Sequence, residues 1–185
     1  MLYNKYFRSF ISISIASAFL LYGAFVRNQI QEKYNSVDEY ILKSFPSDFS
    51  VPSLDGNIID TYSIGAKPVF VHFWATWCGP CEAELPDFVK FSNNFPEFIF
   101  LIISSKDDLT KVKKFVRRLG VPGENVIHGF DESGDLMREF GTLRLPETYF
   151  FDRNRKIVKK FVGPQDWLNE FFVSNFKYLN NDSLN

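Results

Sequence analysis

The chain has only two cysteines, Cys78 and Cys81, and they are separated by Gly79 and Pro80. An apolar run at 68–74 precedes them, and a segment of helix-like composition follows. A dithiol between a strand and the start of a helix is suited to redox chemistry. The helix dipole and its free N–H groups stabilise a thiolate there, which lowers a thiol pKa from about 8.5 to about 3.5–7.5. The spacing therefore predicts thiol–disulfide exchange with Cys78 as the reactive sulfur.

Composition excludes several other classes of function. The 185 residues carry 21 basic and 22 acidic side chains, for a net charge of −1, so no basic field is available to attract nucleic acid. Two cysteines are too few for a disulfide scaffold. Zinc usually takes four ligands, and only His72 and His128 could join the cysteines. Since neither histidine has a paired spacing, we expect no metal and no cofactor.

The first 27 residues are expected to form a signal anchor. Residues 10–26 are uncharged and follow Lys5 and Arg8. About 17 residues at about 1.5 Å each reach about 25 Å, at the short end for a membrane-spanning helix. Basic residues ahead of the run place the following domain outside the cytoplasmic membrane. A cleaved signal peptide is the alternative, because 16–18 has a small-x-small form, although the apolar run continues beyond it.

The rest of the chain divides into a connector, one domain and a tail. Residues 28–47 are polar with some apolar positions at helical spacing, which predicts a linker or stalk. Residues 48–180 are the expected domain, and 181–185 a tail. Continuous apolar runs and turn residues predict strands on either side of a turn at 53–56 and at 68–74, 98–103, 148–151 and 157–162. Helices are expected at 78–93, 106–119, 135–140 and 165–178, with 123–142 as an insert.

Three separate features of this α/β pattern resemble the thioredoxin superfamily. They are the Trp77–Cys81 motif after an apolar strand, Pro86 inside the following helix, and Leu-Pro-Glu-Thr at 145–148 before a β-hairpin. The predicted anchor, the Phe-Trp-Ala-Thr-Trp-Cys sequence and the extra segment at 120–142 are similar to the membrane-anchored TlpA/ResA/CcmG (DsbE) branch. The resemblance implies a thioredoxin-like fold, in which helices flank a mixed central sheet, with a central insert and an N-terminal membrane anchor.

The resemblance also implies a mechanism. Cys78 attacks a partner disulfide, and Cys81 resolves the mixed disulfide. Gly79 and Pro80 let the chain turn tightly into the helix, and Trp77 covers Cys78 and offers an apolar contact. Pro146 is expected to be cis, which exposes the backbone of Leu145 to a partner strand.

Four polar residues near these positions are candidates for acid–base roles, each with a structural alternative. Glu147 is expected to shuttle a proton or raise a thiol pKa, or else to be an exposed strand-end carboxylate. Asp107 and Asp108 are possible acids near the site, or else a helix cap. His72 is a possible base, although burial would lower its pKa, or else a satisfied core histidine.

The function implied by the branch is a membrane-tethered, extracytoplasmic thiol–disulfide oxidoreductase. We expect it to reduce disulfides in selected protein partners, in cytochrome c maturation or respiratory oxidase assembly, and to receive electrons from a membrane thiol relay. Two alternatives stay open. One is a disulfide oxidase or isomerase, and the other is a Cu(I)-binding assembly factor that uses both thiolates.

Overall fold

The computed structural model describes residues 21–26, 48–120, 123–170, 172–174 and 176–177. The chain separates into two compact units, 1–44 and 45–185. In the first, residues 21–26 are helical. No helix in the described part of the chain is long and apolar enough to cross a bilayer. The anchor, stalk and tail predicted from the sequence fall almost wholly outside the described residues.

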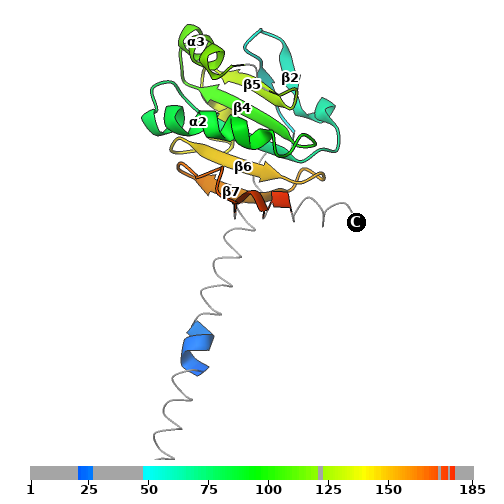
Figure 1. Cartoon of the computed structure of the whole chain (residues 1–185), viewed down its shortest axis with the longest axis vertical. Helices are drawn as coiled ribbons and strands as arrows, with labels where there is room; N and C mark the ends of the chain where they lie inside the picture. The colour runs from blue at the N-terminus through cyan, green and yellow to red at the C-terminus, as the bar shows by residue number, and fades with distance from the viewer. Residues whose placement is uncertain (1–20, 27–47, 121–122, 171, 175, 178–185) are drawn as a thin grey trace, which may run out of the picture. The chain divides into compact units, whose positions relative to one another are not determined.

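Five strands of the second unit form one mixed sheet in the order β5-β4-β3-β6-β7 (Figure 1). The parallel strands are β3 (Val69–Trp74), β4 (Ile99–Ser105) and β5 (Val126–Asp131). The antiparallel hairpin of β6 (Glu147–Phe151) and β7 (Ile157–Val162) completes the sheet. Every residue of β3 and β4 is buried, as continuous apolar runs predict for strands covered on both faces.

The segment at 123–142 differs from its prediction. The sequence predicts an insert with a short helix here, and the structure adds the edge strand β5, which pairs in parallel with β4. Its sequence, Val-Ile-His-Gly-Phe-Asp, has neither a continuous apolar run nor a strict alternation. Two contacts make it a strand. It pairs with β4, and the hairpin of β1 (Ser50–Pro52) and β2 (Ile58–Asp60) covers it through the bridge between Ser53 and Gly129. The short helix α4 (Asp135–Glu139) follows, as predicted.

Helix α2 (Gly79–Ser92) matches its prediction, and Pro86 lies inside it. Helix α3 (Leu109–Leu119) begins three residues later than predicted. Lys106 adopts a left-handed φ of 51°, and Asp108 caps the helix by accepting a hydrogen bond from the Lys111 N–H at 2.9 Å. The C-terminal helix also begins later than predicted, since residues 165–169 are not helical and the first helical residue described there is 170.

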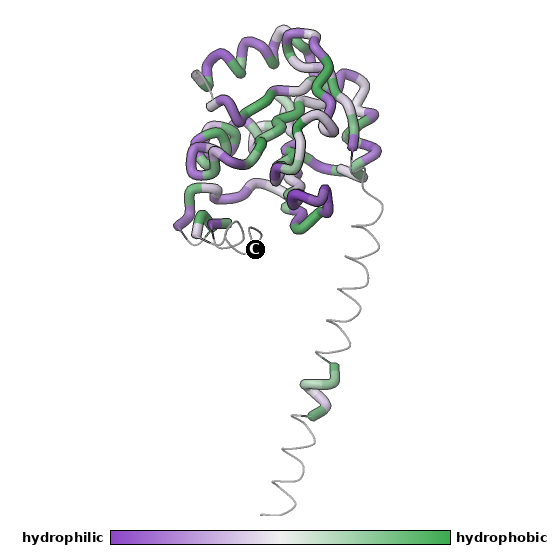
Figure 2. The backbone as a smooth tube through the Cα atoms, turned by 90° about the vertical axis from the view of Figure 1, so that its right-hand side faces the viewer, coloured by the Kyte–Doolittle hydropathy of each residue, from purple (hydrophilic) through white to green (hydrophobic). Residues whose placement is uncertain are grey.

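Aromatic rings fill the space between the sheet and the helices. On one face, Phe70 contacts Phe88 of α2 and Phe176 of the C-terminal helix, and Trp74 contacts Phe115 of α3. The alternate residues of β3 point to the other face, where α4 and the hairpin of β1 (Ser50–Pro52) and β2 (Ile58–Asp60) lie. The apolar segments in Figure 2 accordingly concentrate along the central strands. The two covered faces fix the position of α2, whose first residue follows the first cysteine.

Candidate functional site at the start of helix α2

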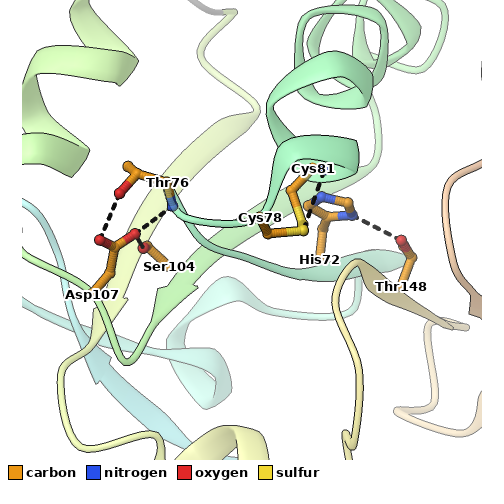
Figure 3. The surroundings of a disulfide bond; sticks show 7 residues. All are labelled: His72, Thr76, Cys78, Cys81, Ser104, Asp107 and Thr148. Carbon is orange, nitrogen blue, oxygen red and sulfur yellow. Dashed lines mark hydrogen bonds between the residues drawn. A yellow bond between two sulfur atoms is a disulfide. The ribbon is translucent and has the colours of Figure 1, made fainter.

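The two cysteines form a disulfide at the N-terminus of α2 (Figure 3). Cys78 is the N-cap residue, with extended φ and ψ of −98° and 97°, and its Sγ accepts a hydrogen bond from the Cys81 N–H at 3.3 Å. Cys78 is 7% exposed, whereas Cys81 is fully buried. A helix N–H group therefore faces the sulfur of Cys78, and Cys78 is the more exposed residue of the pair.

Gly79 and Pro80 occupy the first turn of α2. Proline is favourable there because its missing N–H would have no intrahelical partner. Gly79 has no left-handed φ, and a Cβ at this position would meet no atom within 4 Å. The structure thus gives no steric need for glycine at 79, and the space beside it is open.

The Leu145–Pro146 peptide bond is cis, as the sequence resemblance implies. Leu145 is partly buried against the core, and Pro146 is buried. The Pro146 carbonyl accepts a hydrogen bond from Gly163 at 2.9 Å. Because Glu147 pairs with Phe73 in register, this loop lies beside the end of β3, the strand that leads into the cysteine motif.

His72 lies on β3, on the sheet face covered by α2, and is fully buried. Its Nδ1 is hydrogen-bonded to Thr148 Oγ1 at 2.8 Å, its ring stacks on Phe88, and its Nε2 has no partner. Burial lowers the pKa of His72 to about 3, so the imidazole is neutral at physiological pH. His72 is therefore a core histidine, as the structural alternative predicted, but only one of its two ring nitrogens is hydrogen-bonded.

Asp107 and Asp108 have different environments. Asp107 accepts hydrogen bonds from the Thr76 N–H and hydroxyl and from the Ser104 hydroxyl (Figure 3). Asp108 is the helix cap that the sequence offered as an alternative. The structure thus brings Asp107 to the loop that carries the cysteines and leaves Asp108 at the start of α3.

Trp77 is 63% exposed, and its indole N–H donates to the Lys106 carbonyl at 2.9 Å. The ring is an apolar surface next to the reactive sulfur, and its orientation is fixed from the loop after β4. Trp167, in contrast, is fully buried, as expected of a core residue.

Glu147 is only 3% exposed, so the alternative of an exposed strand-end carboxylate is wrong. Its Oε2 accepts a hydrogen bond from the Tyr149 hydroxyl at 2.8 Å and pairs with Lys160 Nζ at 3.1 Å. It shares a sheet face with Phe73 and Tyr149, and this is the face opposite α2. The contacts that hold the carboxylate therefore lie on the sheet face that α2 does not cover.

Sequence reasoning missed Glu84. It lies one turn after Cys81 on α2 and is 6% exposed. Its Oε1 accepts hydrogen bonds from the Trp167 indole and from the Gln165 N–H, whereas its Oε2 has no partner. Burial raises the pKa of this carboxyl. The i, i+3 spacing from Cys81 was the available signal, because residues three apart share a helix face.

A metal site is not evident among the described residues, where no three His, Cys, Asp or Glu side chains gather as possible ligands. His128 lies on β5, away from the cysteine motif, and its Nδ1 has no partner. Burial lowers the pKa of His128 to about 4.

The fold and the site define a thioredoxin-like protein with a reactive cysteine pair at a helix N-terminus and a cis-proline loop beside it. Residues 43–176 match the Redoxin family, so the chain belongs to that family and is a thiol–disulfide oxidoreductase.

Two curated proteins and one solved structure show the extent of the similarity. The thiol–disulfide oxidoreductase ResA of Bacillus thuringiensis (strain Al Hakam) is 32% identical over 155 residues, covering 83% of each chain. The sporulation thiol–disulfide oxidoreductase A of Bacillus subtilis (strain 168) is 27% identical over 124 residues, covering 64% of this chain and 73% of that protein. A putative DsbE from Chlorobium tepidum superposes with a TM-score of 0.60 at 24% identity, covering 75% of this chain and 94% of that one.

Proposed function

We propose that this protein is a membrane-tethered, extracytoplasmic reductant of disulfides in selected protein partners. The observation that carries the proposal is the asymmetry of the two sulfurs, because Cys78 is reachable at a helix N-terminus and Cys81 is fully buried behind it. Residues 1–27 serve as the anchor, 28–47 as a stalk, 48–180 as the redox domain and 181–185 as a tail.

In the proposed reaction each cysteine acts once as a nucleophile. The Cys78 thiolate attacks one sulfur of the partner disulfide, and the other partner sulfur leaves as a thiol. The Cys81 thiolate then attacks Cys78, which releases the second partner thiol and forms the Cys78–Cys81 disulfide. Two electrons pass to the partner, and a membrane thiol relay returns two electrons to the pair.

Residues around the pair have supporting roles in this proposal. Leu145 and Pro146 present backbone to an extended partner segment, and Trp77 gives it an apolar contact. His72 is a weak acceptor for a proton of Cys81, because burial keeps its pKa low. The resemblance of the sequence to the TlpA/ResA/CcmG branch implies partners in cytochrome c maturation or respiratory oxidase assembly.

The reduction potential of the full chain tests the direction of electron flow. The protein is equilibrated against dithiothreitol or glutathione buffers, and tryptophan fluorescence reports the fraction oxidised. A potential below about −200 mV supports an electron donor, and a potential above about −150 mV would overturn the proposal in favour of an oxidase. The variant Cys81→Ala then traps partners as mixed disulfides, with Cys78→Ala as the matched control that traps none.

A further inference from the structure

Helix α3 concentrates positive charge close to the cysteine pair. Five of its eleven residues are basic, and all five are exposed: Lys111, Lys113, Lys114, Arg117 and Arg118. The whole chain has a net charge of only −1. The charge on α3 is therefore a local feature of one surface.

Helical spacing divides these cations between two edges. Lys111, Lys114 and Arg118, at i, i+3 and i+7, share one edge, which we call the near edge. Lys113 and Arg117, four residues apart, share the far edge. Arg118 lines a groove between α2 and α3, whereas Lys113 lines a separate hollow beside the β1–β2 hairpin and α4. The near edge therefore faces α2, and the far edge faces away from it.

The groove of the near edge reaches the residue next to the reactive cysteine. Its walls include Gly79, which directly follows Cys78, and Pro86 of α2, opposite Phe115 and Leu119 of α3. The open space beside Gly79 leaves this end of the groove unobstructed. The Trp77 indole also donates to the Lys106 carbonyl just before α3, so the helix and the motif are held together at that point.

The near-edge cations are not neutralised within the described part of the chain. None of Lys111, Lys114 and Arg118 forms an ion pair there, and the Arg118 guanidinium lies 5.1 Å from the centre of the Phe115 ring. Glu82 is the acid that lines the groove. Unpaired cations around an apolar floor complement an acidic segment with apolar side chains, and such charge steers encounter between proteins.

We propose that the near edge and its groove dock an acidic segment of the disulfide-bearing protein partner, which brings the partner disulfide to Cys78. This inference rests on the proposed function. A protein segment fits better than an anionic lipid surface, because a bilayer seated over the groove would cover the approach to the sulfur.

The test measures single-turnover disulfide reduction by the full chain in a non-ionic detergent. The protein is first reduced with dithiothreitol and freed of it. Two peptides share the same disulfide, and one has Asp and Glu beside it where the other has Ser and Gln. We expect the acidic peptide to react about 10-fold faster at low salt, with the advantage lost as salt screens the charges. A peptide pair that reacts equally fast contradicts the inference.

Two charge-reversal variants locate the effect. Lys114→Glu/Arg118→Glu alters the near edge, and Lys113→Glu/Arg117→Glu makes the same change in net charge on the far edge. The readout is the ratio of the two peptide rates within each variant, since impaired folding lowers both rates together. The near-edge variant should reduce the ratio to about 1 or below, and the far-edge variant should keep most of it. If the ratio falls equally in both variants, the near edge is not the docking surface.

Two further outcomes separate the alternatives. The full chain in phosphatidylcholine vesicles, with and without phosphatidylglycerol, tests lipid as the occupant. If the near-edge substitutions change the rate of peptide reduction only in vesicles that contain phosphatidylglycerol, the near edge binds the membrane and the inference is wrong. Hydroxyethyl disulfide, which is uncharged, tests the chemistry alone. If the wild type fails to reduce it or either peptide, the proposed function itself is wrong, and the inference falls with it.

Discussion

Asp107 fixes Thr76 through two hydrogen bonds, one from the threonine N–H at 2.5 Å and one from its hydroxyl at 2.7 Å (Figure 3). Thr76 directly precedes Trp77 and Cys78, whereas Asp107 follows β4. The carboxylate therefore ties the loop that carries the reactive sulfur to the end of the neighbouring strand. Its third contact, from the Ser104 hydroxyl at 3.1 Å, anchors it to the same strand.

The first prediction concerns this contact. Asp107→Ala leaves the Thr76 N–H and hydroxyl without their acceptor, so we expect a loss of about 1–3 kcal/mol in unfolding free energy. The loop should also loosen, which raises the accessibility of Trp77 to a fluorescence quencher. Asp108→Ala is the control, because it removes a helix cap at about 1 kcal/mol and should leave Trp77 unchanged. Equal quenching in both variants would contradict the role of Asp107.

The second prediction separates two roles for Glu147. Glu147→Gln weakens the contact with Lys160 and the bond from Tyr149, so we expect a stability loss of about 1–3 kcal/mol. The pH at which Cys78 becomes reactive toward iodoacetamide should stay the same, since the carboxylate lies on the sheet face opposite α2. A shifted pH profile with unchanged stability would instead support proton transfer by Glu147.

The third prediction follows from the buried histidines. Unfolded His72 takes up a proton near its ordinary pKa of 6.5, whereas the folded form does so only near 3. The unfolded state binds more protons between these values, so stability falls as pH decreases from about 6.5, by up to about 1.4 kcal/mol per pH unit for one such group. His128, with a folded pKa of about 4, acts in the same direction.

Urea unfolding of the oxidised chain between about pH 5 and pH 7, where both histidines contribute, measures how stability changes with pH. His72→Asn should lower the slope by up to about 1.4 kcal/mol per pH unit, whatever it does to the absolute stability. His128→Asn is the matched variant with the same expected change. A slope that survives both substitutions would show that other groups cause the pH dependence.

The fourth prediction concerns Glu84. Burial raises its pKa, so the folded state holds a proton that the unfolded state loses, and stability falls as pH rises from about 4.5 to the raised value. Glu84→Gln removes this titration and keeps an oxygen for Trp167 and Gln165. The stability of the variant relative to the wild type, measured by urea unfolding, should therefore rise as pH increases above about 4.5.

Glu82→Gln is the control on the same helix. The Glu82 carboxylate lies in the first turn of α2, where it interacts favourably with the helix dipole. The substitution should therefore lower the free energy of unfolding by about 0.3–1 kcal/mol at neutral pH. If both variants respond to pH alike, the environment of Glu84 is not the cause.

The sequence alone determined the features that depend on residues close together in the chain. Continuous apolar runs predicted β3 and β4. The apolar run before the cysteines and the helix-like segment after them predicted a pair at the start of a helix. The Asp-rich turn after β4 predicted a helix cap, which Asp108 provides. Local signals succeed here because a strand pattern, a helix start or a cap is specified by a few neighbouring residues.

Only the tertiary structure decided the features that join distant segments. The irregular sequence of β5 becomes a strand because β4 supplies its partner groups. Asp107 meets Thr76 across 31 positions, and Glu84 meets Trp167 across 83. Both edges of α3 carry exposed cations, and only the packing of α2 on one side and of the β1–β2 hairpin and α4 on the other distinguishes them. Such contacts depend on how the sheet brings its elements together, which local patterns do not encode.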